Sequence, residues 1–150
     1  MKMSKQTKVT ASGIIVFRNK NNNPEILGLI ALPQHRKRSK GRYDVPKGRI
    51  DEGETILQAA YRECFEESGL EPKIINNNPI VSGPLALWIG EVDPDDEVVL
   101  TDNPYTGELE HEGYEWLTMK DMRKNCLNYL RPFIIKSEKE IWEYFRYWSR

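Results

Sequence analysis

Cysteine is scarce in this chain, and long apolar runs are missing. The 150 residues include only two cysteines, Cys64 and Cys126, which are too few for a disulfide framework and lack the spacing of a zinc site. We therefore expect reduced thiols and a cytoplasmic location. No apolar run approaches the roughly 20 residues that cross a bilayer, and the opening MKMSKQTK has no apolar segment of the kind found in secretory signals. These absences predict no membrane partner.

A strong net charge is also missing. Basic and acidic residues number 22 and 23, which gives a formal net charge of -1 at pH 7. Any attraction for nucleic acid or for an anionic membrane must therefore come from a local patch. The chain does contain enough apolar residues, 39% of the total, to bury a hydrophobic core. We expect one domain over residues 1–150, with a core of about 8–148.

Strand-like and helix-like patterns alternate irregularly along the chain. Runs of β-branched and apolar residues predict strands over 9–18, 25–32, 85–92 and 111–117, with a further short strand at the end of 93–100. Helices are expected over 55–68, 118–125 and 137–148, where Thr55 with Gln58 and Ser137 with Glu140 have the spacing of capping boxes. Because these elements follow no regular βαβ order, we predict an α+β fold with a mixed β-sheet.

Three glutamates lie within five positions of the predicted helix 55–68. Glu63, Glu66 and Glu67 are three and four residues apart, which places them on one face of the helix. Like charges at these spacings destabilise a helix by roughly 0.2–0.5 kcal/mol per pair. An acidic cluster of this kind, taken alone, is usually a solvated helix face. A divalent cation beside it would turn the repulsion into coordination.

The glutamates belong to a longer pattern. The segment GRIDEGETILQAAYRECFEESGL (48–70) has the form G-x5-E-x7-R-E-U-x-E-E-x-G-U, where U is a bulky apolar residue. It resembles the signature of the Nudix hydrolases, and each polar and glycine position of that signature is filled. The departure is Cys64, where the family usually has Ile, Leu or Val, and cysteine behaves as a small buried hydrophobe. The resemblance implies the Nudix fold, a mixed sheet sandwiched between helices.

The resemblance also implies a reaction and a set of roles. The reaction is hydrolysis of a phosphoanhydride bond with Mg²⁺ or Mn²⁺, which binds carboxylate and phosphate oxygens together and lowers the pKa of a bound water. The residues implied as metal ligands are Gly48, Glu63, Glu66 and Glu67, and those implied in catalysis are Glu54, Arg62, Glu63 and Glu67. Which carboxylate takes the proton of the water stays open.

A basic stretch leads into this motif. Lys47 directly precedes Gly48, and a lysine at this place can meet a phosphate as a point charge. The loop 33–42 carries Arg36, Lys37, Arg38, Lys40 and Arg42. Basic runs are most often solvated surface. Because this run enters the motif, we expect at least one member, with Arg42 as a candidate, to contact a phosphate of the substrate.

A second informative segment is ELEHEGYEWL (108–117). It resembles the part of Nudix dinucleoside polyphosphate hydrolases that supplies a further carboxylate and an aromatic residue for the base. On that match Glu110 is the further ligand or base and Tyr114 a stacking residue, while Glu112 competes with Glu110 for the carboxylate role. Trp88 is either a core residue or a wall of the base pocket.

The substrate class follows from the same resemblance. PKG at 46–48 together with EHEGYEWL favours a small nucleotide substrate, a dinucleoside polyphosphate such as diadenosine tri- or tetraphosphate. The alternatives are an ADP-ribose- or FAD-type pyrophosphatase and an enzyme that removes the cap from an RNA 5′ end, for which the basic loop is suited. A catalytically inactive module that binds nucleotide or RNA is the non-enzyme alternative, and the presence of every motif glutamate argues against it.

Overall fold

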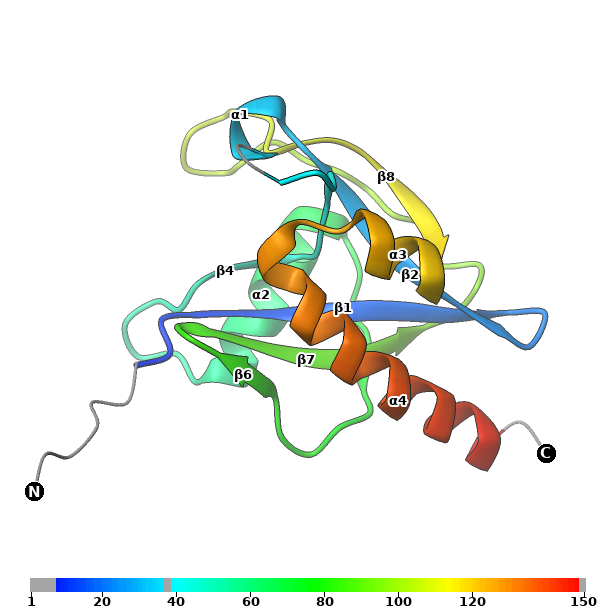
Figure 1. Ribbon diagram of the computed structural model, residues 1–150. Coiled ribbons are helices and arrows are strands. Elements are labelled where there is room, and N and C mark those ends of the chain that lie inside the picture. Colours follow the sequence, from blue (N-terminus) through cyan, green and yellow to red (C-terminus); the bar gives the residue numbers. More distant parts are fainter. Residues whose placement is uncertain (1–7, 37–38, 149–150) are drawn as a thin grey trace, which may run out of the picture.

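The computed structural model describes residues 8–36 and 39–148 and shows a mixed sheet with helices on both faces (Figure 1). The strands are β1 (Ala11–Lys20), β2 (Asn23–Ala31), β3 (Tyr43–Asp44), β4 (Lys47–Arg49), β5 (Lys73–Ile74), β6 (Ile80–Ser82), β7 (Leu85–Val92) and β8 (His111–Thr118). The helices are α1 (Pro33–Arg36), α2 (Ile56–Ser68), α3 (Met119–Asn125), the 3₁₀ helix η1 (Asn128–Leu130) and α4 (Arg131–Trp148). The predicted α+β class is confirmed.

Strand β1 organises the sheet. It pairs in parallel with β7 along its length, from Ala11 opposite Leu85 to Arg18 opposite Val92. On its other edge its second half forms a hairpin with β2, closed by Asn21 and Asn22 at positive φ. The first half of that edge pairs with β4. This pairing with β4 brings the first residues of the glutamate motif against the centre of the sheet.

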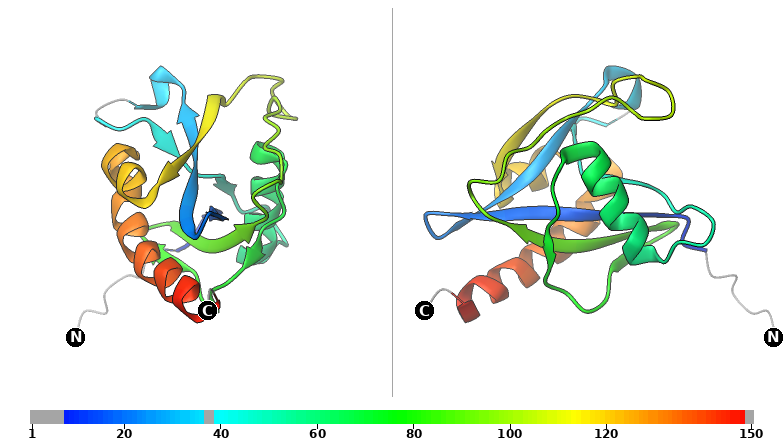
Figure 2. Two further views of the ribbon diagram at one scale, coloured as in Figure 1. Left: turned by 90° about the vertical axis from the view of Figure 1, so that its right-hand side faces the viewer. Right: turned by 180° about the vertical axis from the view of Figure 1, so that it is seen from behind.

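Alternation along the strands creates two apolar faces. In β1, Ile15 and Phe17 face the core beneath α3 and α4, whereas Ile14 and Val16 face the core beneath α2. All four side chains are fully buried. The turned views show α2 against one face of the sheet and α4 along the other (Figure 2). The sheet is therefore the layer that separates the two cores.

Helix α2 begins and ends where the sequence predicts. The Thr55 side chain accepts a hydrogen bond from the N–H of Gln58, and the Gln58 side chain accepts one from the N–H of Thr55, so the predicted capping box is confirmed. Gly69 ends the helix with φ 73°, a left-handed conformation that glycine adopts at little cost. These local signals fix the ends of α2, and the buried Ala60 and Cys64 fix which side of it lies against the sheet.

One predicted helix start and one predicted strand are wrong, although residues 137–148 are helical as predicted. Helix α4 begins at Arg131, not at Ser137, whose buried hydroxyl donates to the carbonyl of Ile134 within the helix. No strand forms at 97–100 in the described chain; the N–H of Val99 donates to the carbonyl of Ser68 at the end of α2 instead. The capping pattern at Ser137 was overridden because Phe133 and Ile134 bury a turn of helix upstream of it.

Two sequence-based expectations concern residues other than 8–36 and 39–148. The opening stretch taken to lack a secretory signal lies almost wholly in residues 1–7, and Lys37 and Arg38 of the basic loop are also outside the described residues. Within the described residues, no helix is long and apolar enough to cross a membrane.

Candidate active site

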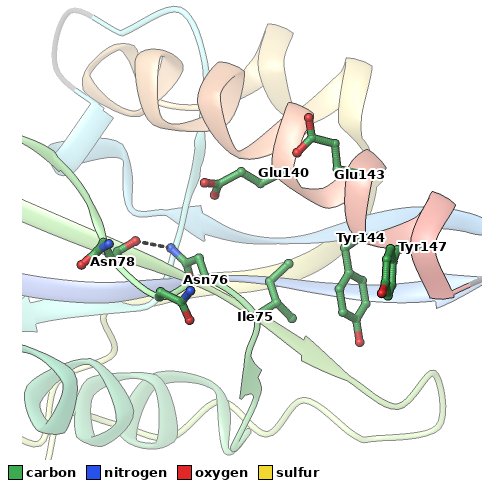
Figure 3. A pocket seen from close by; sticks show the side chains of 8 residues that line it. Ile75, Asn76, Asn78, Glu140, Glu143, Tyr144 and Tyr147 are labelled. Carbon is green, nitrogen blue, oxygen red and sulfur yellow. Dashed lines mark hydrogen bonds between the residues drawn. The ribbon is translucent and has the colours of Figure 1, made fainter.

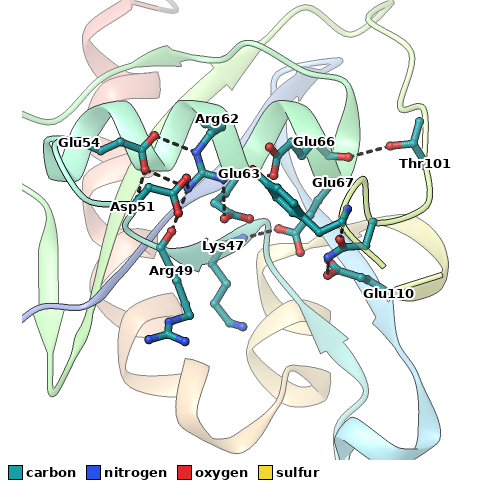
Figure 4. A network of polar contacts seen from close by, with 12 residues as sticks. Lys47, Arg49, Asp51, Glu54, Arg62, Glu63, Glu66, Glu67, Thr101 and Glu110 are labelled. Atoms are coloured by element: carbon teal, nitrogen blue, oxygen red, sulfur yellow. Dashed lines mark hydrogen bonds and ion pairs between the residues drawn. The ribbon is translucent and has the colours of Figure 1, made fainter. Parts of the chain in front are cut away.

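The acidic side of α2 faces a cleft of about 350 Å³ between β4 and the loop 101–110 (Figure 4). Residues from all three segments form its walls: Lys47, Gly48, Arg49, Asp51, Arg62, Glu63, Glu66, Glu67, Thr101, Asn103, Pro104, Tyr105 and Glu110. The structure thus brings together most of the residues that the motif resemblance singles out. The loop is held to α2 by a hydrogen bond from the Thr101 hydroxyl to the carbonyl of Glu66, 2.9 Å long.

Arg62 ties the carboxylates of the motif together. Its Nε and Nη2 atoms lie 2.8 and 3.0 Å from the two carboxylate oxygens of Glu54. Its Nη1 atom lies 2.9 Å from Glu63 Oε1 and 3.2 Å from Glu66 Oε2. Hydrogen bonding to Arg62 lowers the pKa of Glu54, and the same bond raises the pKa of the guanidinium. One cation therefore offsets part of the repulsion among three acids and orients two of them.

The remaining negative charge is not neutralised. Burial raises the pKa of Glu67 well above its usual range, and the nearby charges of Asp44 and Glu110 raise it further. Burial also raises the pKa of Glu63, against the effect of Arg62. Both shifts mean that the protein disfavours the ionised carboxylates as they stand. A bound divalent cation would reverse that preference, and these oxygen donors fit a hard ion such as Mg²⁺ or Mn²⁺.

Strand β4 supplies the opposite wall at very close range. The N–H of Lys47 donates to Glu67 Oε2 over 2.6 Å. A Cβ atom at Gly48 would lie 2.2 Å from the carboxylate carbon of Glu63. The glycine of the motif is therefore needed for space, because any side chain would occupy the place of the Glu63 carboxylate.

Replacing Gly48 by Ala is expected to lower kcat by about 10²-fold, the cost of moving a catalytic group by roughly 1 Å. The displaced group is the end of the Glu63 side chain, so the fold should survive. Steady-state kinetics with circular dichroism would check this. Gly113→Ala is the matched control, since its new Cβ would make only an ordinary contact, 3.6 Å from Ile30 Cδ1. Normal turnover in Gly48→Ala would contradict the position of the Glu63 carboxylate directly against Gly48, or its part in catalysis.

Glu110, not Glu112, faces the cleft. Glu110 accepts a hydrogen bond from the Asn103 side-chain amide, which comes from the same loop. Glu112 is exposed and pairs with Arg36, 3.4 Å away. Of the two carboxylates left open by the sequence, Glu110 is the one that lines this cleft.

Lys47 lies at the border of the cleft and a second, mostly apolar cavity. Its ammonium is 3.4 Å from Asp44 Oδ2 and 5.4 Å from the ring centroid of Tyr129. The Tyr129 hydroxyl donates to Asp44 Oδ1 over 2.6 Å. The second cavity, of about 470 Å³, is lined by Ala11, Lys47, Ser82, Gly83, Pro84, Leu85, Tyr129 and Phe133. One lysine therefore connects an acidic, metal-suited cleft with an apolar cavity.

Three residues expected to bind substrate lie elsewhere. Arg42 is exposed, pairs with Glu115 at 3.6 Å and does not line the cleft. Tyr114 on β8 is 42% exposed and also lies outside the cleft walls. Trp88 packs on the core beneath α2, where its Nε1 is buried without a hydrogen-bond partner among the described residues. The structure does not bring these side chains to Glu63 and Glu67.

A cavity of about 490 Å³ between α4 and residues 75–78 contrasts with the cleft (Figure 3). Glu140 and Glu143 of α4 are among the residues that line it, and burial together with the charge of Glu143 raises the pKa of Glu140. No lysine or arginine occurs among the described residues that line it. Its charge is therefore unsuited to phosphate, and its size alone does not make it the active site.

Several residues of the site were missed by the sequence reasoning. Asp44, Asn103 and Tyr129 have no motif spacing, and Asp44 and Tyr129 meet across 85 positions of the chain. His111 follows Glu110 directly, and this adjacency was the one signal that could have drawn attention to it. It is buried close to Glu67 and Glu110, and burial lowers its pKa.

Comparison with known proteins agrees with this architecture. Two RNA pyrophosphohydrolases, from Psychromonas ingrahamii and Francisella tularensis subsp. mediasiatica, are 43% and 41% identical to the chain over 61 and 63 residues. These segments span only 29% and 36% of those proteins. A crystal structure of a C. elegans Ap4A hydrolase binary complex, 24% identical, has a TM-score of 0.70 and covers 87% of this chain and 97% of that one, a likeness of fold. A family model described as NUDIX domain matches residues 7–135, and the chain therefore belongs to the NUDIX family.

Proposed function

We propose that this protein is a pyrophosphohydrolase that cleaves a phosphoanhydride bond in a nucleoside diphosphate linked to another moiety. The observation that carries the proposal is the cleft in which Glu63, Glu66, Glu67 and Glu110 converge beside Lys47. Carboxylates alone would repel a phosphate chain. Together with a divalent cation and a lysine they form a site that holds phosphate and stabilises the charge of in-line displacement.

The protein's own groups have separable tasks in this reaction. Mg²⁺ or Mn²⁺, held by Glu63, Glu66, Glu67 and the carbonyl of Gly48, would supply charge compensation and a water of lowered pKa. Arg62 orients Glu63 and Glu66, and the N–H of Lys47 orients Glu67. One carboxylate among Glu63, Glu67 and Glu110 accepts the proton of the attacking water. The Lys47 ammonium attracts the phosphate chain toward the border of the two cavities.

The leading substrate is a dinucleoside polyphosphate such as diadenosine tri- or tetraphosphate. The apolar cavity beside Lys47 supports this choice, because Tyr129 is 43% exposed and offers an aromatic surface to a base. A phosphate chain in the acidic cleft would then continue into a nucleoside in the neighbouring cavity. ADP-ribose- or FAD-like dinucleotides have the same two parts and form the next candidates. Stacking by Tyr114 or Trp88 stays a prediction.

An RNA 5′ end is the second candidate substrate. The specific observation in its favour is the identity of 43% over 61 residues with a protein named RNA pyrophosphohydrolase. Arg36, which belongs to the basic loop, lies near β8 through its contact with Glu112, and Arg42 is exposed. These cations would suit the backbone of an RNA strand that leaves the cleft.

A substrate panel in Mg²⁺ tests the proposal. We expect hydrolysis of diadenosine tetraphosphate ahead of ADP-ribose, NADH, FAD, 5′-triphosphorylated RNA and capped RNA, and loss of turnover with EDTA that Mg²⁺ or Mn²⁺ restores. Reaction in ¹⁸O-labelled water identifies the phosphorus that is attacked. Hydrolysis of RNA alone would select the second candidate. Hydrolysis of none, with tight nucleotide or RNA binding, would replace the proposed enzyme by a binding module.

A cytoplasmic location belongs to the same proposal. Both cysteines are buried and free, and burial raises the pKa of the Cys64 thiol to about 12. Such thiols are unreactive structural residues, which fits a reducing compartment.

A further inference from the structure

The imidazole of His111 is largely buried next to the cleft carboxylates. Only 8% of the residue is exposed, and neither ring nitrogen makes a hydrogen bond within the part of the chain that the structure describes. The ring is not fully sealed from solvent: among the described residues the fully buried side-chain atom without a partner is Trp88 Nε1, not a nitrogen of His111. His111 begins β8 at the bulge opposite Ala31, where the pairing with β2 shifts register. The strand geometry therefore places this ring largely inside the protein, with its nitrogens free of hydrogen bonds to the described residues.

The ring is directed at two carboxylates. One nitrogen of His111 and one oxygen each of Glu67 and Glu110 all lie within 4.8 Å of one another. Ligand atoms on opposite sides of one ion, bound at about 2.1 Å, are about 4.2 Å apart. Small rotations of the side chains would therefore bring the three atoms onto one ion. Both glutamates line the cleft, whereas His111 is not among the residues that line it.

The charges that surround the ring favour a cation in that place. Asp44 and Glu110 supply negative charge, which the ammonium of Lys47 opposes. Glu67 adds a second carboxylate within the cluster itself. A neutral imidazole offers a lone pair in the midst of this excess of carboxylates, which is the form in which histidine binds metals.

We propose that Glu67, Glu110 and His111 form a mixed nitrogen–oxygen site for a divalent first-row transition ion such as Mn²⁺, Co²⁺ or Zn²⁺. The site goes beyond the proposed function, whose metal is held by the oxygen ligands on α2 and β4, and it shares Glu67 and Glu110 with the cleft described there. Imidazole binds transition ions well, whereas Mg²⁺ prefers oxygen. The protein should therefore bind Mn²⁺ and Co²⁺ through a nitrogen that Mg²⁺ does not use.

Pulsed electron paramagnetic resonance on Mn²⁺-loaded protein tests this directly, because it detects ¹⁴N bound to the ion. The chain has only two histidines, so one pair of variants assigns the signal. We expect ¹⁴N coupling in the wild type and in His35→Gln, whose side chain is exposed, and its loss in His111→Gln. The Kd for Mn²⁺ should rise at least about tenfold in His111→Gln, with Mg²⁺ affinity unchanged.

Absence of ¹⁴N coupling in the wild type, or its persistence in His111→Gln, would overturn the proposal. If His111→Gln fails to fold, the wild type and His35→Gln are labelled with ¹⁵N-histidine and titrated with Zn²⁺. The ¹⁵N NMR chemical shift of a nitrogen that binds the ion changes strongly, so this measurement tests the site without the variant. An unshifted His111 nitrogen at saturation would count against the site. Mg²⁺-supported hydrolysis without nitrogen ligation would overturn this inference and leave the proposed function in place. Nitrogen ligation without hydrolysis of any substrate would support the metal site and overturn the proposed function.

Discussion

Glu67→Gln is expected to lower kcat by about 10²- to 10⁴-fold, the range for loss of a group that orients or deprotonates the attacking water. The fold should remain, because the amide oxygen of Gln can still accept the hydrogen bond that Lys47 N–H donates to Glu67. What is lost is a negative charge in the cleft, and with it affinity for the divalent cation. Steady-state kinetics over a range of Mg²⁺ concentrations measures both effects.

The exposed Glu71, which follows α2, provides the matched control. Glu71→Gln removes an equal charge outside the cleft and should keep wild-type turnover. A Glu67→Gln enzyme with near-normal kcat at saturating Mg²⁺ would remove Glu67 from the catalytic machinery.

Glu67→Gln also tests how much the buried carboxylate of Glu67 destabilises the metal-free protein. In metal-free protein the pKa of Glu67 is raised by burial, so between its unfolded and folded pKa values the folded state binds more protons than the unfolded state. The contribution of Glu67 to the free energy of unfolding should therefore fall as pH rises upward from about 4.5. Glu67→Gln lacks the titrating carboxyl group, so its free energy of unfolding should fall less over the same pH range than that of the wild type. Thermal unfolding in EDTA at pH 4.5 and pH 8 checks the difference, and parallel curves would contradict it.

Arg62→Ala is expected to have the second large effect, on stability and activity together. Arg62 is the shared partner of Glu54, Glu63 and Glu66, and its side chain is only 24% exposed. Removing it leaves three acids without their common cation, at a cost of about 2–3 kcal/mol for a partly buried network. For a chain of this length the Tm should drop by about 5–10 °C. Differential scanning calorimetry measures the loss.

Adding Mg²⁺ should reduce the difference in Tm between Arg62→Ala and the wild type, because the carboxylates that no longer pair with Arg62 attract the ion more strongly. Arg18→Ala is the control: Arg18 pairs with Glu25 at 2.8 Å and lies outside the cleft walls, so its loss should leave kcat unchanged and the response to Mg²⁺ like that of the wild type. If Arg62→Ala kept wild-type kcat, the guanidinium would have no part in positioning Glu63 and Glu66.

The local part of the site was predictable. Thr55, Gln58 and Gly69 set the ends of α2 through contacts within a few residues, and helix geometry then places Glu63, Glu66 and Glu67 together. Ser137 shows the limit of such signals. Its capping pattern is as good as that of Thr55, yet it lies inside α4, because burial of apolar residues upstream stabilises more helix than a cap does.

The sequence by itself determined the acidic helix face, the family resemblance and the need for a divalent cation, since all three depend on spacing along one short segment. Tertiary structure alone decided that Glu110 rather than Glu112 faces that helix, that Arg42 does not, and that Lys47 adjoins an apolar cavity beside Tyr129. It also placed His111 against Glu67. These contacts join residues far apart in the chain, and sheet pairing and burial, which no local pattern encodes, determine which of them meet.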